Sequence, residues 1–96
     1  MEDVAAMKLI AVAERGSIKD FIDVHALLKA GWNISALLDT VNRKYKDVNY
    51  NLAHILKSLT YFADADNETM PLMYDKISWV KIKREISAAV ADELGR

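Results

Sequence analysis

Near the N-terminus, four charged residues of types that can handle phosphate lie on either side of one short turn. Lys8 and Arg15 lie seven residues apart in an apolar segment, and Asp20 and Asp23 follow a Gly-Ser pair. A lysine supplies a mobile cation for a triphosphate, and an aspartate can hold a proton or a metal ion. The same residues can also form ion pairs that join two helices. Their spacing alone leaves both interpretations open.

Helix geometry sets the relative heights of these charges. Two helices joined at the Gly-Ser pair would fold back as an antiparallel hairpin. At about 1.5 Å of rise per residue, Lys8 and Asp23 then lie at similar distances from the turn, as do Arg15 and Asp20. We therefore expect both pairs to form across the hairpin. Lys19 precedes Asp23 by four residues and is an alternative surface partner for it.

The elements that must position these residues are helices, because apolar residues recur with helical spacing throughout the chain. Each predicted helix has candidate N-terminal caps: Asp3, Ser17, Asn33 or Ser35, Asn49 or Asn51, and Asp75 or Ser78. Gly16 and Gly31 can end the first two helices. The sequence predicts an all-α fold: a compact bundle of about five helices that opens with the antiparallel helix-turn-helix hairpin. We expect a single helical domain over residues 1–96.

Each predicted helix carries an apolar stripe for the core. The second helix has the broadest apolar surface, which favours a position with neighbours on more than one side. The fourth helix continues to Phe62, and the polar segment 64–71 is expected to be a loop that Pro71 ends. The residues of these apolar faces are Ala5, Leu9, Val12, Ala13, Ile18, Phe21, Ile22, Val24, His25, Leu27, Leu28, Leu37, Leu38, Val41, Tyr45, Leu52, Ile55, Leu56, Leu59, Phe62, Trp79, Ile82, Ile86, Ala89 and Val90.

Composition excludes several classes of function. The chain has no cysteine, so it has no disulfide, thiolate zinc site or cysteine nucleophile. Its net charge of −1 gives no strong field toward nucleic acid or anionic lipid. The N-terminus is acidic, unlike a signal peptide, and the apolar run at residues 9–13 is far shorter than the ~20 residues that span a bilayer. These features predict a soluble cytoplasmic protein.

The first charged block resembles a family signature. The pattern K-L-x-A-x-x-x-R-G-x-x-[KR]-D-x-x-D-[VLI] is similar to that of the AbiEii/AbiGii nucleotidyltransferase toxins. Two later blocks, residues 58–66 and 78–81, are similar to a leucine-tyrosine-phenylalanine-aspartate segment and a serine-tryptophan block of the same family. The residues that match the first pattern are Lys8, Leu9, Ala11, Arg15, Gly16, Lys19, Asp20, Asp23 and Val24.

The resemblance implies a function and a site. Members are toxins of bacterial abortive-infection and toxin–antitoxin systems that transfer nucleotides, to RNA in some relatives. They use Mg²⁺ and a nucleoside triphosphate, held by an N-terminal half with a Gly-Ser loop and a D-x-D pair. By this resemblance Lys8 contacts the triphosphate and Asp23 is the late acidic residue of the site. Arg15, Lys19 and Asp20 would support and orient them.

The parts that would hold the metal are not expected in these residues. Nucleotidyl transfer needs a nucleophile in line with the α-phosphate and a divalent cation. Gly16 and Ser17 belong to the helical motif, and Asp64-Ala65-Asp66 lies in the tail of a predicted helix. We expect no metal or cofactor site in this chain. The chain is predicted to be the C-terminal helical half of a transferase, inactive alone and completed by an N-terminal half that is encoded separately or missing.

Other residue groups suggest other functions. Asp64, Asp66, Glu68 and Asp75 resemble a calcium loop, but Thr69 stands where that loop needs glycine. His25 and His54 are expected to be packing or surface residues, because no further ligands accompany them. Trp79 is expected to anchor the core.

Two non-enzymatic functions also remain open. A basic strip on the third and last helices would bind RNA weakly, if those helices are adjacent. An apolar patch would make the chain a binding module for an antitoxin or for a second copy of itself. The residues of the basic strip are Lys44, Lys46, Lys81, Lys83 and Arg84.

Overall fold

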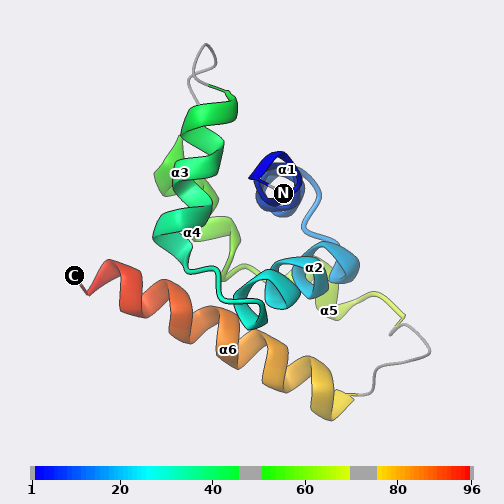
Figure 1. Cartoon of the computed structure of the whole chain (residues 1–96). Coiled ribbons are helices and arrows are strands. Elements are labelled where there is room, and N and C mark those ends of the chain that lie inside the picture. Colours follow the sequence, from blue (N-terminus) through cyan, green and yellow to red (C-terminus); the bar gives the residue numbers. More distant parts are fainter. Residues whose placement is uncertain (1, 46–50, 70–75, 96) are drawn as a thin grey trace.

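The computed structural model describes residues 2–45, 51–69 and 76–95, and within these ranges every regular element is a helix (Figure 1). This confirms the all-α prediction. Five of the helices have seven residues or more, and α5 is a single turn. The helices are α1 (Glu2–Glu14), α2 (Ile18–Lys29), α3 (Ile34–Lys44), α4 (Leu52–Ser58), α5 (Ala63–Asp66) and α6 (Lys76–Leu94).

Local sequence signals explain most of the helix ends. Gly16 has a φ of 61°, the left-handed conformation that closes α1, and Gly31 has a φ of 108° just beyond α2. Asn33 caps α3 and Asn51 caps α4, each by accepting a backbone N–H three residues later. The alternative cap Asn49 lies outside the described residues, as does Asp75.

The expected cap at Asp3 is wrong, because α1 already includes Glu2 and Asp3. An aspartate in the first turn of a helix still lies close to its free N–H groups, so the residue type indicates the end without fixing the position.

The fourth predicted helix is shorter than expected and ends at Ser58. The backbone then tightens, with Thr60 N–H donating to Lys57 and Tyr61 N–H donating to Ser58. The segment expected to be a polar loop instead begins with the short helix α5. Pro71, the expected end of that loop, lies outside the described residues.

The helices pack around α1. Helix α1 contacts α2, α3 and α4, whereas α2 and α3 also contact α6. The expectation that α2 has neighbours on two sides is confirmed, and α1 contacts three helices. In Figure 1 α1 is viewed along its axis while α2 runs across the view, so the two arms of the hairpin are inclined to each other. Among the described residues, no helix combines the length and hydropathy that a bilayer span requires.

An aromatic cluster joins α2, the α4–α5 connection and α6. The ring of Phe21 lies 4.9 Å from that of Phe62 and 6.0 Å from that of Trp79. The rings of Phe62 and Trp79 meet edge to face at 5.9 Å. Phe21 is fully buried and Trp79 is 6% exposed, which confirms Trp79 as a core anchor. This cluster fixes one end of the hairpin to the last helix.

Candidate functional site

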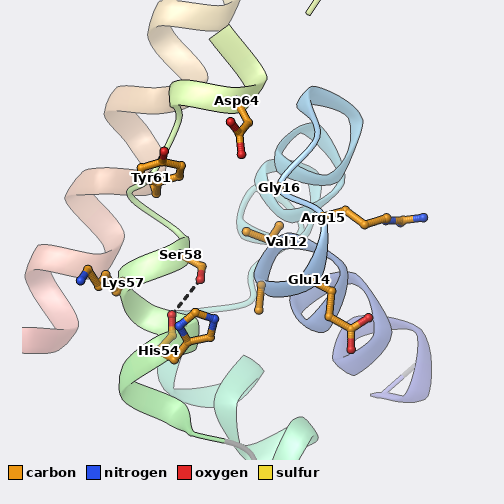
Figure 2. A pocket seen from close by; sticks show the side chains of 10 residues that line it. Val12, Glu14, Arg15, Gly16, His54, Lys57, Ser58, Tyr61 and Asp64 are labelled. Atoms are coloured by element: carbon orange, nitrogen blue, oxygen red, sulfur yellow. Dashed lines mark hydrogen bonds between the residues drawn. The ribbon is translucent and has the colours of Figure 1, made fainter. Parts of the chain in front are cut away.

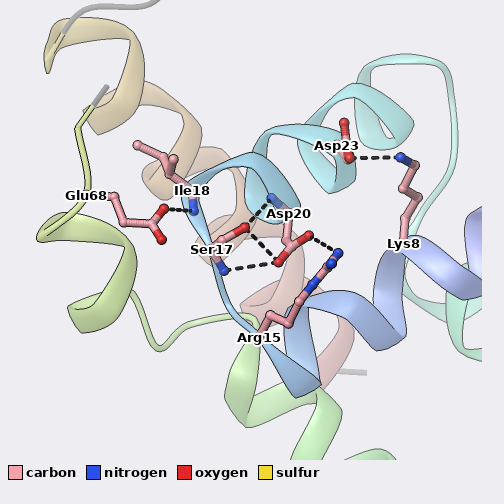
Figure 3. Close-up of polar contacts among 7 residues, drawn as sticks. All are labelled: Lys8, Arg15, Ser17, Ile18, Asp20, Asp23 and Glu68. Atoms are coloured by element: carbon pink, nitrogen blue, oxygen red, sulfur yellow. Dashed lines mark hydrogen bonds and ion pairs between the residues drawn. The ribbon is translucent and has the colours of Figure 1, made fainter. Parts of the chain in front are cut away.

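The two charged pairs predicted across the hairpin are both present. Lys8 lies near the middle of α1, and its Nζ donates to Oδ2 of Asp23 on α2 at 2.9 Å (Figure 3). The two side chains are 40% and 42% exposed, so each remains accessible to a ligand or a partner. An exposed pair of this kind contributes only about 0–1 kcal/mol to folding. The pair therefore adds little to the free energy of folding, and stability alone does not explain why these two residues are present.

Asp20 has a different environment although it lies only three residues before Asp23. It is 4% exposed and receives donors from both sides of the turn. Arg15 Nη2 donates to its Oδ1 at 2.8 Å, and the backbone N–H and hydroxyl of Ser17 donate to its Oδ2 at 3.1 and 2.8 Å (Figure 3). Ser17 in turn accepts the N–H of Asp20, which completes a capping box. These contacts give Asp20 a structural role in forming the turn.

The alternative surface pair between Lys19 and Asp23 is not formed, because Asp23 contacts Lys8. Lys19 is exposed, and within residues 2–45, 51–69 and 76–95 it makes no ion pair. The contacts therefore separate the predicted residues: Lys8 and Asp23 form an accessible pair, Arg15 and Asp20 hold the turn, and Lys19 stays in solvent.

Glu68 also holds the start of α2, and the sequence analysis missed this role. Its Oε1 accepts the N–H of Ile18 at 2.7 Å, across 50 positions of sequence (Figure 3). A carboxylate here satisfies a free N–H of the first turn and opposes the positive end of the helix dipole. The only sequence signal was an acidic residue in a polar segment, which does not indicate the helix that it contacts.

The D-x-D triplet on α5 is a structural anchor. Asp66 Oδ1 accepts from the indole N–H of Trp79 at 2.7 Å and from Lys83 Nζ at 3.0 Å. The hydrogen bond from Lys83, and then that from Trp79, hold the pKa of Asp66 below its ordinary value. Asp64 is exposed, whereas Glu68 is bound to α2.

These contacts do not form a metal site. Of the acidic residues that resemble a calcium loop, Asp66 contacts Trp79 and Lys83, Glu68 contacts Ile18, and Asp64 is exposed. Asp75 lies outside the described residues. Across the described part of the chain, no three His, Asp or Glu side chains converge as metal ligands. Asp66 and Glu68 therefore connect neighbouring elements of the fold.

Comparison with known proteins decides the family. The model of the family described as nucleotidyl transferase AbiEii toxin, type IV TA system, matches residues 1–93. The chain belongs to the AbiEii nucleotidyl transferase toxin family. It is also similar to an uncharacterized protein of Aquifex aeolicus (strain VF5), aq_aa25, with 36% identity over 96 residues. That alignment covers 97% of this chain but only 44% of the relative. No solved structure matches the chain.

The histidines of this AbiEii chain lie away from the Lys8–Asp23 pair. His25 Nε2 is 2.6 Å from Oε1 of Glu85, which links α2 to α6. The hydrogen bond to His25, and then that to Lys29, lower the pKa of Glu85. His54 is exposed on α4. These contacts agree with the expected packing and surface roles.

The basic strip is not continuous on the AbiEii chain. Lys44 pairs with Asp3 at 3.5 Å, and Lys83 pairs with Asp66. Helices α3 and α6 do contact each other, but the C-terminal end of α3, which carries Lys44, is the end remote from α6 (Figure 1). Lys81 and Arg84 are exposed on α6, and Lys46 lies outside the described residues. The geometry gives no extended path for an RNA backbone.

A groove of about 330 Å³ lies between the end of α1 and the α4–α5 segment. Val12, Gly16, His54, Tyr61 and Asp64 line it (Figure 2). The two basic side chains at its edges, Arg15 and Lys57, extend away from the centre (Figure 2). The groove therefore lacks a cation directed at a bound phosphate, whereas Lys8 offers one on the hairpin.

Proposed function

We propose that these 96 residues are the helical C-terminal part of an AbiEii-like nucleotidyltransferase. In this proposal the chain presents Lys8 and Asp23 to a catalytic half, and it does not transfer nucleotides alone. The observation that supports this most directly is the 2.9 Å contact between these two side chains, both partly exposed, within a segment that matches the family. The function belongs in the bacterial cytoplasm, where nucleoside triphosphates and RNA are available.

The chemistry of the pair suits an accessory role. The Lys8 ammonium is a compact charge on a flexible stem, so it can turn from Asp23 toward a phosphate held opposite it. Asp23 keeps that stem extended before the ligand arrives and can accept a hydrogen bond from the ligand afterwards. The turn built on Asp20 keeps α1 and α2 in register. Nothing among the described residues supplies a metal-binding trio, so that part is assigned to the catalytic half.

The first test is an assay of the chain alone. We expect no transfer when the 96-residue chain is incubated with labelled nucleoside triphosphates, Mg²⁺ and tRNA. Robust label incorporation by the purified chain would contradict the proposal that it is inactive alone.

The second test concerns Lys8 in a longer family member. In the intact Aquifex aeolicus relative, methionine at the position aligned with Lys8 should lower transfer by roughly 10²-fold, because a cation on the phosphate is removed. Methionine at the position aligned with Lys57, an exposed lysine of α4 outside the family signature, is the matched control and should leave transfer unchanged. Thermal unfolding of both variants separates loss of chemistry from loss of fold. Equal activity of the two variants would reject the role of Lys8.

A second candidate function is a binding module without chemistry, with an antitoxin as its partner. It is favoured by the apolar side chains Val4 and Met7, which are 45% and 55% exposed on α1. This candidate predicts that the Lys8 position tolerates methionine without any loss of transfer. The two candidates therefore make opposite predictions for the same variant.

A further inference from the structure

Helix α1 has one face that residues 2–45, 51–69 and 76–95 leave open. Its other sides pack on α2, α3 and α4, and they carry Ala5, Ala6, Leu9, Ile10 and Val12, all at 7% exposure or less. The open face of α1 is formed by Val4, Met7, Lys8 and Ala11. Figure 1 shows α1 end-on, with α3 on one side of it and α2 below it.

The open face is apolar at its centre. Residues at spacings of three, four and seven share one side of a helix, so Val4, Met7 and Ala11 form a single stripe. Isolated exposed apolar residues are common on protein surfaces. Here they are aligned, and they lie on a helix that is apolar on nearly all sides, a property of helices that are buried on all sides.

Two of the charges at the edge of the stripe have partners, whereas Glu14, seven residues after Met7, is exposed and makes no ion pair among the described residues. Lys8 is paired with Asp23, and Asp3 is paired with Lys44 of α3 at 3.5 Å. A protein surface that covers the stripe therefore needs to be apolar where it meets Val4, Met7 and Ala11.

We propose that the open face of α1 docks the catalytic half of the transferase; this proposal rests on the proposed function. Lys8 projects from the open face beside Met7 and Ala11. A catalytic half that brings a phosphate to Lys8 must therefore lie over the same stripe. The Aquifex aeolicus relative has more than half of its length outside the aligned region, since the alignment covers 44% of it. The relative thus has enough additional chain to supply such a half.

A second copy of this chain is a poorer occupant. A stable interface between separate molecules buries about 800 Å² on each partner, and two large apolar side chains supply only a small part of that area. A half joined in the same polypeptide acts at high effective concentration, so a smaller contact suffices.

The experiment compares the isolated chain with the intact Aquifex aeolicus relative by thermal unfolding. In the isolated chain, Met7→Glu should shift Tm by no more than about 2 °C, because Met7 is exposed. In the relative, glutamate at the aligned position should lower Tm by roughly 4–8 °C, because it would place a charge in an apolar contact. The control is Val80→Glu, at a residue of α6 that is 53% exposed, and at its aligned position; it should have little effect in either protein.

Limited proteolysis of the relative provides a second measurement. Loss of docking should make the connection between the halves cleavable in the glutamate variant while each half remains resistant. Equal Tm shifts in the relative and the isolated chain, with unchanged proteolysis, would overturn the proposal. A dimer of the isolated chain in sedimentation that Met7→Glu dissociates would overturn it too, by assigning the face to a second copy.

The docking readouts do not depend on transfer. If glutamate at the position aligned with Met7 disrupts docking in the relative while methionine at the Lys8 position leaves transfer unchanged, the docking surface is supported and the proposed role of Lys8 in the chemistry is rejected. In the reverse pattern, methionine at the Lys8 position abolishes transfer and glutamate at the Met7 position has no effect on Tm or proteolysis. That result supports the role of Lys8 and rejects the docking surface.

Discussion

Two aspartates in one motif, three residues apart, have opposite environments. Asp20 is buried and accepts hydrogen bonds from Arg15 and Ser17, whereas Asp23 is 42% exposed and contacts Lys8. A buried acceptor that is fully used cannot be released without leaving donors unpaired. An exposed acceptor can exchange one partner for another. The motif thus combines a structural carboxylate with an available one.

The first prediction compares isosteric variants of these two residues. Asp20→Asn should lower the free energy of unfolding by about 2 kcal/mol, because it weakens the Arg15 contact and places an amide among donors. Asp23→Asn should cost only about 0–1 kcal/mol, as expected for an exposed ion pair. Urea unfolding followed by tryptophan fluorescence measures both. Equal losses in the free energy of unfolding for the two variants would show that Asp20 and Asp23 do not differ in burial and hydrogen bonding as described.

The second prediction concerns acid stability and Asp66. Hydrogen bonds from Lys83 and then Trp79 lower the pKa of Asp66 in the folded chain below the ordinary value of 3.8. The stabilisation is therefore fully present above the unfolded pKa, and it is lost as pH falls through the lower folded pKa. Asp66→Asn should destabilise the chain at pH 7, and the difference from the unmodified chain should shrink below about pH 4.

The matched control for Asp66 is its neighbour in the same triplet. Asp64 is exposed, and within the described ranges its side chain makes no hydrogen bond or ion pair. Asp64→Asn should leave unfolding at pH 7 unchanged. A pH-independent cost of Asp66→Asn would mean that the shape of the side chain, and not its charge, is what Trp79 and Lys83 require.

At the scale of the elements, local signals explain what could be predicted. Ser17, Asn33 and Asn51 were found as caps because a cap bonds within three residues of itself. The break after Ser58 was missed because Leu59 and Phe62 keep helical spacing while serving tertiary contacts. Phe62 packs on Phe21 and Trp79, and periodicity alone cannot distinguish that contact from a continued helix.

In the candidate site too, contacts set by local spacing could be predicted, whereas contacts between distant segments could not. The Lys8–Asp23 and Arg15–Asp20 contacts follow from the residue spacing around one turn, and both distances confirm them. The contact of Glu68 with Ile18 and the roles of Asp66 depend on how distant segments meet. The buried Thr40, whose hydroxyl donates to Leu37, was likewise not in the expected core, because threonine is more often exposed.

The third prediction tests the turn that sets the register of α1 and α2. Gly16 has a φ of 61°, and a Cβ there would lie 3.4 Å from the carbonyl oxygen of Val12. Gly16→Ala should therefore lower the free energy of unfolding by about 1–2 kcal/mol, because residues with a side chain disfavour this conformation. Gly95→Ala, in the last turn after α6, has no positive φ and should cost less. Equal losses in the free energy of unfolding for the two variants would mean that the turn at Gly16 does not set the register of α1 and α2.

At the scale of the molecule, one core connects the site to the last helix. Helix α2 carries Asp23 on one side and Phe21 on another, and Phe21 meets both Phe62 and Trp79. The radius of gyration of 12.8 Å corresponds to a folded chain of this length. The position of Asp23 relative to Lys8 therefore depends on packing that includes α6.

The fourth prediction follows from this dependence. Phe21→Ala should lower the free energy of unfolding by about 3–5 kcal/mol, because it leaves a cavity among the three aromatic rings. A folded domain has only about 5–15 kcal/mol in total, so this one substitution would remove a large part of the stability of the chain. Phe21→Leu keeps most of the volume and should cost less.

If the chain is one cooperative unit, far-UV circular dichroism and tryptophan fluorescence should report the same unfolding midpoint in each variant. Separate midpoints would mean that the hairpin bearing Lys8 and Asp23 folds independently of α6, in which case damage to the aromatic cluster would leave the charged pair intact.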